Sequence, residues 1–365
     1  MQKNTPNAPL ILVGAGHAHL VTLRQWAAKG FSAPAGSLLI NPDPHAWYSG
    51  MMPGLIAGRF QPEQCRIPLA PLCAASGLEL VCAAVSSITA DNSALELADG
   101  QRIAFDTLSL NSGAKAPVLF EHDQSLALIG AKPFPHFIRQ WQQWLTTPPR
   151  QLAIVGAGAA GFELAMALRI SLPGTQIDLF SSGTLLASHP PRLARLASNR
   201  LRKAQITLHE HSPIDRITSG QLYVKQQPVL QPQAVILATG TAAPDWQQHS
   251  GLNCDTEGFI RIDSHLRSLD HDNIFASGDC ASLPQTPHSG VYAVRQGSVL
   301  ADNLIAHLQG SPLGSFQPQS KALALLSCAD GRALLSYGPL ASEGKLAGRF
   351  KDWLDLRFMQ QQRLT

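Results

Sequence analysis

The sequence predicts an α/β protein with two similar strand–turn–helix units, the second inserted in the first, followed by a small C-terminal α+β unit. Three observations lead to this prediction. An apolar segment runs into a glycine-rich turn and then a helical pattern near residue 14, and the same order recurs near residue 156. Further apolar segments ending in glycine motifs lie before and after the second copy. A linker rich in proline, glycine and serine at 311–320 precedes the last part of the chain.

The composition is that of a globular protein with a large core. Of the 365 residues, 45% are hydrophobic and 15% are charged, which excludes a disordered chain and allows two or three domains. The formal net charge of +3 is too small to predict a nucleic-acid partner. The six cysteines contain no C-x-x-C pair, which argues against a metal site or a disulfide scaffold and favours a reducing compartment.

The sequence predicts a cytoplasmic protein, attached at most to the inner face of a membrane. Residues 1–9 lack the basic and then apolar pattern of a signal peptide. No apolar run reaches the roughly 18 residues that a membrane-spanning helix needs.

The first glycine motif follows the apolar segment 9–13 and precedes a helical pattern at 20–29. Gly14 and Gly16 allow a sharp turn and a close approach to a pyrophosphate, whose charge is stabilised by free N–H groups at the start of the helix. His19 stands where a third glycine normally permits close packing of helix on strand. A plain strand–turn–helix connection explains this first motif equally well.

The second glycine motif is complete. The apolar segment 151–155 leads into Gly156, Gly158 and Gly161, then a helical pattern at 162–170 and a further strand at 176–180. Two such units about 140 residues apart form an internal repeat, and we expect each to bind one dinucleotide in a Rossmann-like domain.

The end of the second strand in such units often carries a carboxylate that binds the adenosine ribose. In the first unit Asn41 or Asp43 could take this role, and a simple Asn-Pro-Asp-Pro turn is an equally good interpretation. In the second unit Ser181 and Ser182 offer neither a carboxylate nor an adjacent arginine. The sequence therefore leaves NADH and NADPH open.

Three segments carry a resemblance to a known family: Asn111-Ser-Gly113, Ala238-Thr-Gly240 and the stretch 273–281 that contains Ile-Phe-Ala-Ser-Gly-Asp. In their order they resemble the flavoproteins with two dinucleotide-binding domains, which include pyridine nucleotide-disulfide reductases, type II NADH dehydrogenases and sulfide:quinone oxidoreductases. The motifs at 17–19 and 48–55 resemble the NADH dehydrogenase-like branch associated with selenide, water dikinase, which implies a possible association with that enzyme.

The resemblance implies FAD and NAD(P)H as cofactors. It places Asp279 at the ribityl chain of FAD and directs the N-terminus of the helix after Ser289 at the flavin ring. Tyr292 and Gln296 are equally well explained as packing residues. The residues that we expect at the cofactors are Gly14, Gly16, His17, Ala18, Asn41, Ser49, Gly50, Met51, Ser112, Gly113, Gly156, Gly158, Ala160, Gly161, Ser181, Thr239, Gly240, Gly278, Asp279, Gly290 and Tyr292.

The cysteines do not match thiol chemistry. Disulfide reductases need a redox pair just after the first unit, where residues 48–55 contain none, and the spacing of Cys65 and Cys73 does not fit. Sulfide:quinone oxidoreductases also use a cysteine pair, one member in the middle of the chain and one toward its end, yet no cysteine lies between Cys82 and Cys254. No side chain is assigned a catalytic role, because hydride transfer to flavin is chemistry of the cofactors. The histidines, His17 and His19 included, are better explained as satisfied polar residues.

The C-terminal part is expected to form a hairpin of strands at 322–328 and 333–337 and then a helix at 344–359. Along that helix, apolar residues fall on or near one face, bordered by basic residues. This pattern fits contact with an anionic membrane, a homodimer interface, or packing on the protein's own domain. The face holds Leu346, Phe350, Trp353, Leu354 and Leu356, and the border holds Lys345, Arg349, Lys351 and Arg357.

These observations predict an FAD-binding domain from residues 1–115 and 240–310, an NAD(P)-binding domain at 116–239 and a C-terminal interface unit at 311–365. The predicted function is an FAD-dependent NAD(P)H dehydrogenase that reduces a quinone or another small acceptor. The alternatives are a sulfide- or selenide-type oxidoreductase, and a flavin-binding sensor or partner subunit without rapid turnover.

Overall fold

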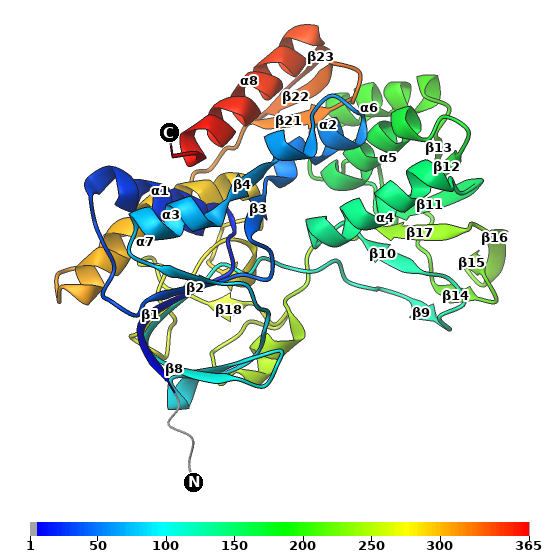
Figure 1. Ribbon diagram of the computed structural model, residues 1–365. Helices are drawn as coiled ribbons and strands as arrows, with labels where there is room; N and C mark the ends of the chain where they lie inside the picture. The colour runs from blue at the N-terminus through cyan, green and yellow to red at the C-terminus, as the bar shows by residue number, and fades with distance from the viewer. Residues whose placement is uncertain (1–5, 365) are drawn as a thin grey trace.

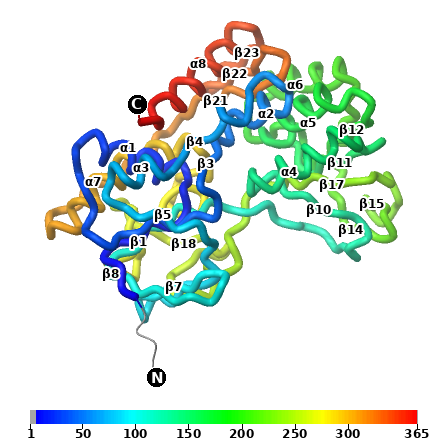
Figure 2. Tube along the Cα trace, viewed as in Figure 1, coloured from blue at the N-terminus to red at the C-terminus, as the bar shows by residue number. Residues whose placement is uncertain are grey.

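A computed structural model describes residues 6–364. Figure 1 shows two α/β lobes, with the C-terminal segment lying across the top of both. The first lobe contains the N-terminal sheet, to which the later strand β19 returns, and the second lobe contains the sheet built from the middle of the chain. The tube in Figure 2 shows the chain crossing between the lobes in both directions. The predicted fold class, with one Rossmann-like unit inserted in another, is confirmed.

The sheet of the first lobe brings three strand ends to one edge. Strands β5, β2, β1 and β8 are parallel, and β19 pairs with the second half of β8 while β7 pairs with its first half. Val13, Leu110 and Ala276 lie in register, so the loops that follow them meet. The strands are β1 Asn7–Val13, β2 Leu38–Ile40, β5 Glu79–Val81, β6 Val85–Thr89, β7 Ala94–Leu97, β8 Arg102–Leu110 and β19 Ile274–Ala276.

Two helices pack tightly on this sheet. Helix α1 (His17–Lys29) and helix α7 (Gly290–Leu308) approach so closely at Gly297 that an added Cβ would lie 2.7 Å from the Ala18 carbonyl oxygen. The Trp26 indole donates to the Ala301 carbonyl over 3.0 Å, which fixes the register of the pair. Smaller elements of this lobe are β3 His45–Trp47, η1 Ser49–Met51, α2 Met52–Ile56, η2 Pro62–Gln64, β4 Arg66–Pro68, α3 Leu69–Ala75, η3 Ala90–Asn92, η4 Asp245–His249, β18 Ile260–Arg261, η5 Gly278–Cys280 and β20 Ala281–Ser282.

The second lobe repeats the parallel arrangement, with strand order β10-β17-β11-β12-β13. Its central strands β11, β12 and β17 are mostly apolar and buried, as expected when helices cover both faces of a parallel sheet. A small sheet of order β16-β15-β14-β9, which the sequence did not predict, adjoins it. The elements are β9 Glu121–His122, β10 Leu128–Gly130, α4 Phe134–Thr146, β11 Gln151–Val155, α5 Ala159–Ser171, β12 Gln176–Phe180, α6 Pro191–Lys203, β13 Thr207–His209, β14 Arg216–Thr218, β15 Gln221–Val224, β16 Gln227–Leu230 and β17 Ala234–Leu237.

The C-terminal unit is an antiparallel sheet of β21 (Ala324–Ser327), β22 (Ala333–Tyr337) and β23 (Leu340–Gly344), followed by helix α8 (Lys345–Gln362). The hairpin and the helix expected from the sequence are present, and β23 is an additional strand. The unit contacts α5 and α6 of the second lobe and α1 of the first.

Several apolar side chains of helix α8 point outward, whereas Met359 near its C-terminal end is buried in the core. Leu346 is 79% exposed and Trp353 is 50% exposed, and Phe350 lies on the same exposed face. The inward face instead holds Gly348, which packs against the backbone of the β21–β22 turn, and the charged Asp355. The expectation that Lys351 borders the apolar face is wrong, because its side chain is 12% exposed and turned toward the first lobe. An amphipathic period does not say which face points inward when the surface beneath is polar.

Candidate cofactor sites

The first candidate site lies where the loops after β1, β8 and β19 meet. Gly14 has a φ of +85°, and a Cβ there would lie 2.6 Å from the Asn111 carbonyl oxygen. At Gly16 a Cβ would lie 2.3 Å from the Asn111 side-chain oxygen. Both glycines are therefore required by close backbone approach, as the motif predicted.

Asn111 holds this site together. Its amide nitrogen donates to the Ser277 carbonyl over 2.7 Å, and its amide oxygen accepts from the His19 backbone N–H over 3.2 Å. One buried side chain thus links the start of α1 with the loops after β8 and β19. The sequence identified Asn111 only as part of a motif, because its two partners lie far away in the chain.

His19 replaces the missing third glycine without opening a gap. The ring is fully buried, with Nδ1 2.6 Å from the Gly14 carbonyl oxygen and Nε2 2.9 Å from the Ser109 hydroxyl. Burial lowers its pKa to about 4, against the effect of the Gly14 carbonyl. The neutral ring therefore hydrogen-bonds helix to strand, which agrees with its interpretation as a satisfied polar residue.

A cavity of about 140 Å³ opens at these loops, below the N-terminus of α7. Its charged side chains are Lys132, which reaches in from the second lobe, and Asp279, and these two form an ion pair. Burial lowers the pKa of His17, which also lines the cavity, to about 4, so this ring is neutral. The predicted residues that line the cavity are Gly16, His17, Ser49, Gly113, Gly278, Asp279 and Gly290, and those the prediction did not include are Asn111, Lys132, His288, Ser289 and Ala293.

Other predicted residues of the first site lie beside the cavity. Asn41 accepts from the Ala15 backbone N–H and donates to the Asp43 carbonyl, so both side-chain ends hold the turn. Gly50 accepts from Lys351 through its carbonyl oxygen.

The Tyr292 hydroxyl donates to the Gln319 carbonyl. Gln296 accepts from the Gly278 backbone N–H over 2.6 Å, which favours its interpretation as a packing residue. Ala18 and Met51 are buried in the core, and Ser112 follows Asn111 in the loop after β8.

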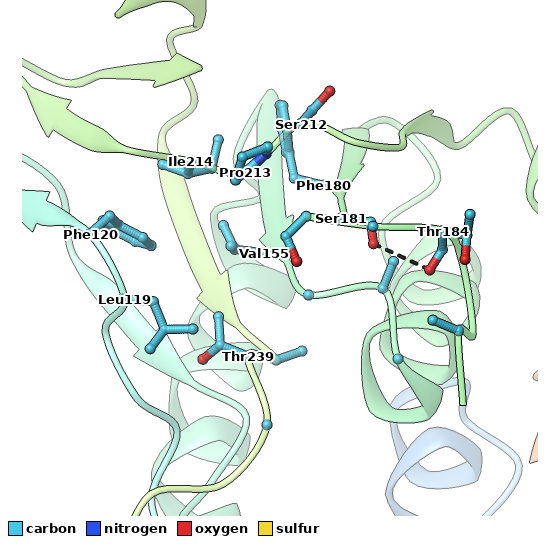
Figure 3. Close-up of a pocket in the computed structure, with 18 of the residues that line it drawn as sticks. Leu119, Phe120, Val155, Phe180, Ser181, Thr184, Ser212, Pro213, Ile214 and Thr239 are labelled. Carbon is cyan, nitrogen blue, oxygen red and sulfur yellow. Dashed lines mark hydrogen bonds between the residues drawn. The ribbon is translucent and has the colours of Figure 1, made fainter. Parts of the chain in front are cut away.

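The second candidate site is a cavity of about 500 Å³ at the ends of β11, β12 and β17, shown in Figure 3. Gly156, with a φ of +108°, turns the chain, and a Cβ at Gly161 would lie 1.8 Å from the Gly156 carbonyl oxygen. Gly161 therefore allows α5 to approach the turn, and its neighbour Ala160 lies beside it in the first turn of α5. The predicted residues that line the cavity are Gly156, Gly158, Ser181, Thr239 and Gly240.

The wall of the second cavity carries no charged side chain among the residues that line it. Figure 3 shows the Ser181 hydroxyl directed at the Thr184 carbonyl, 3.5 Å away. The nearest carboxylate along the strand, Asp178, is buried and hydrogen-bonded to His209. The sequence did not predict the other lining residues, which are Leu119, Phe120, Val155, Ala157, Phe180, Ser182, Gly183, Thr184, Ala187, Ser188, Ser212, Pro213, Ile214 and Ala238.

Five of the six thiols are held in their protonated form. Burial raises the pKa of Cys65 and Cys73 to about 12, and it also raises the pKa of Cys280, whose sulfur lies near the loop after β8. Cys328 and Cys254 are shifted upward for the same reason. A thiolate is the reactive form of cysteine, so these five groups are unsuited to thiol–disulfide exchange.

A third group of ionisable residues lies where the two lobes and the C-terminal unit meet. Lys351 donates to Asp355 of the same helix and to the Gly50 carbonyl, each over 2.9 Å. The Tyr48 hydroxyl donates to Asp355 over 3.1 Å. From the second lobe, Glu163 accepts from the Ser327 backbone N–H over 2.6 Å, and burial raises its pKa to about 7 although Lys351 opposes the shift.

Aromatic rings connect this junction with the first cavity. Tyr48 stacks on Phe358 of α8 with ring centroids 4.7 Å apart, and His17 lies 5.4 Å from Tyr48. The sequence did not predict this group, because its members come from four separate segments. The only local signal for this group was Glu163, two positions after Gly161 in the second glycine motif.

Comparison with known proteins relates these sites to a family. The sequence matches the pyridine nucleotide-disulphide oxidoreductase family over residues 8–297. NADH dehydrogenase-like protein YutJ of Bacillus subtilis is 24% identical over 351 residues, covering 93% of this chain and 94% of that protein. The type II NADH:quinone oxidoreductase of Haemophilus influenzae is 28% identical over 222 residues, covering 54% of this chain and 50% of that protein. The sulfide:quinone oxidoreductase of Aquifex aeolicus has the same fold, with a TM-score of 0.77 and 16% identity over 98% of this chain and 91% of that chain.

The matched range contains both glycine turns, the loop after β8 and the Gly278-Asp279 turn, so the family match and the geometry concern the same residues. The glycine positions and the lining of the two cavities suit dinucleotides that approach the backbone closely. The resemblance to the flavoproteins with two dinucleotide-binding domains is confirmed. The chain belongs to the pyridine nucleotide-disulphide oxidoreductase family and is an NAD(P)H-dependent flavin oxidoreductase with FAD and NAD(P)H as its cofactors.

Proposed function

We propose that this protein is an FAD-dependent NAD(P)H dehydrogenase that reduces a quinone or another small acceptor. The observation that carries the proposal is a pair of dinucleotide-type cavities without a reactive thiol at the first one, where residues 48–55 contain no cysteine. Bound FAD and NAD(P)H would themselves supply the chemistry of hydride transfer and onward electron transfer. The protein then has to bind, orient and shield them.

We assign FAD to the first cavity and the nicotinamide dinucleotide to the second. In the first, Asp279 would accept a hydroxyl hydrogen bond, and the N-terminus of α7 at Gly290 would stabilise negative charge on the flavin. We keep the bounds 1–115 and 240–310 for the FAD domain and 116–239 for the NAD(P) domain. In the second cavity, Gly156 and Gly158 would meet the pyrophosphate at the start of α5.

The outward face of α8 supports a lipid-soluble acceptor. Leu346, Phe350 and Trp353 form an exposed apolar strip, with Arg349 and Arg357 exposed beside it. Apolar side chains flanked by cations suit the surface of an anionic membrane. Within residues 6–364, no helix is long and apolar enough to cross a membrane. We therefore propose a peripheral contact through 344–365. A homodimer and an association with selenide, water dikinase stay predictions.

The test is anaerobic mixing of the purified flavoprotein with NADH or NADPH while the flavin absorbance near about 450 nm is followed. Rapid bleaching that an added quinone reverses supports the proposal and ranks the two donors. Bound flavin that neither donor reduces contradicts the dehydrogenase and favours a sensor or partner subunit. Rapid flavin reduction by sulfide or selenide instead of NAD(P)H would support the sulfur-type alternative, which the protonated thiols disfavour.

A further inference from the structure

Lys132 is the contribution of the second lobe to the first cavity. Lys132 lies just after β10. The backbone N–H of the preceding residue, Ala131, donates to the Leu237 carbonyl over 2.9 Å. Pro133 follows Lys132 directly as the N-cap residue of helix α4, which begins at Phe134. A Cβ on Gly130 would lie 2.5 Å from the Lys132 carbonyl oxygen, so the backbone is closely packed here. The lysine is thus presented from a fixed strand end, 147 residues away in sequence from its partner Asp279.

The charges at this cavity are few. Lys132 and Asp279 are the two charged side chains that line it, and they pair across the two lobes. His17 does not add a positive charge near neutral pH, as shown above. The side chain of Asp279 is 15% exposed and that of Lys132 is 40% exposed, so the pair lies at the edge of the cavity. Lys132 is therefore the one lysine or arginine among the described lining residues.

We propose that Lys132 is a positioning and electrostatic residue for FAD: its ammonium lies beside the flavin and favours the reduced, negatively charged form. The inference rests on the assignment of FAD to the first cavity. A cation near a site where charge develops stabilises that charge, and the effect grows where water is excluded. Since Lys132 belongs to the lobe that binds the nicotinamide, the position of that lobe would set the electron affinity of the flavin.

The experiment compares Lys132→Gln with Lys132→Arg and with the matched control Lys115→Gln. Lys115 also lies between the two lobes and pairs with Asp245, but on the surface. Each purified holoprotein is titrated with dithionite beside a reference dye, and the midpoint potential of the bound flavin and the dissociation constant of FAD are measured. Neither NAD(P)H nor an acceptor is needed, so the result is independent of the proposed turnover.

We expect Lys132→Gln to weaken binding of reduced FAD about tenfold relative to oxidised FAD, which lowers the midpoint potential by about 30 mV for a two-electron couple. Lys132→Arg and Lys115→Gln should stay close to the wild type. An unchanged potential in Lys132→Gln overturns the inference. If Lys132→Gln loses FAD, retention by Lys132→Arg supports a charge contact, whereas loss in both variants shows a purely structural role and overturns it. A wild-type protein with a normal titration but no reduction by NAD(P)H would contradict only the proposed function.

Discussion

The Lys351 ammonium lies 2.9 Å from an Asp355 carboxylate oxygen on the inward face of α8, one helical turn apart. Both side chains are largely buried, at 12% and 8% exposure. Around them, Tyr48 and the Gly50 carbonyl supply the remaining hydrogen bonds from the first lobe. Polar contacts therefore help to hold the C-terminal helix on the protein beside the buried Met359, while Leu346, Phe350 and Trp353 face outward.

Lys351→Met should destabilise the protein, because it leaves Asp355 buried without its cation. Removal of one partner from a buried pair costs about 3–5 kcal/mol. Urea unfolding at neutral pH measures the change in the free energy of unfolding. The control is Lys345→Met, at an exposed position in the first turn of the same helix, which should change stability by less than about 0.5 kcal/mol. Equal effects of the two substitutions would show that the buried pair has no special importance.

The stability of the protein should fall between pH 4.5 and 7 because of Glu163. Burial raises the pKa of this carboxyl from its usual value of 4.5 to about 7 in the folded protein. In this pH range the unfolded chain loses the proton while the folded protein keeps it, so each step upward in pH favours unfolding. The whole contribution is up to about 3 kcal/mol, and it stays constant above the folded pKa.

Glu163→Gln tests this prediction, since the amide oxygen can still accept from the Ser327 backbone N–H. The stability of the variant relative to the wild type should rise as the pH increases from 4.5 to 7. Urea unfolding curves at several pH values give this difference. Parallel stability profiles for the two proteins would show that Glu163 titrates normally in the folded state.

Local patterns predicted the elements around the glycine motifs, because each of them shows the apolar pattern of a strand or a helix next to a glycine-containing turn. These elements are β1, β11, β12, β17, α5 and α7. These signals depend on residues close together in the chain. The small sheet at β9 and β14 and the strand β23 were not predicted, because short edge strands have weak periodicity.

The candidate site was predicted where a motif fixes backbone geometry, as at Gly16 and Gly156. It was not predicted where side chains meet across the fold. Lys132 reaches Asp279 from another lobe, and Glu163 meets Lys351 at a junction of three units. The orientation of α8 was also undetermined, because its inward face combines the charged pair Lys351 and Asp355 with the apolar Met359.

Gly161→Ala should weaken nicotinamide binding more than FAD binding. Its methyl group would meet the Gly156 carbonyl oxygen, so α5 must move away from the turn at a cost of about 1–3 kcal/mol. We expect the dissociation constant of NADH to rise about tenfold while the FAD content stays constant, measured by titration of the holoprotein. Gly174→Ala is the control, as no atom lies within 4 Å of a Cβ there. An unchanged NADH affinity in Gly161→Ala would contradict the assignment of the second cavity.

Opposite charges at Ser182 should shift the choice of donor in opposite directions. Ser182 is exposed at the rim of the second cavity, directly after the buried Ser181. Ser182→Asp would repel the 2′-phosphate of NADPH, and Ser182→Arg would attract it. We expect the ratio of kcat/KM for NADH over NADPH to rise about tenfold in the first variant and to fall about tenfold in the second. Identical ratios in both would place the adenosine ribose elsewhere.

The outward face of α8 should bind anionic vesicles. Burying the side chains of Phe350 and Trp353 in the interface contributes about 1.5–3 kcal/mol each, and nearby cations add electrostatic attraction. The double substitution Phe350→Ser and Trp353→Ser should therefore weaken cosedimentation with phosphatidylglycerol vesicles more than tenfold, while flavin reduction by NAD(P)H in solution stays unchanged. Leu145→Ser is the control, because Leu145 is a comparably exposed apolar residue on α4. Equal vesicle binding by the double variant and the control would show that this face meets a protein surface. A halved mass of the double variant in solution would then identify the outward face of α8 as the interface of a homodimer.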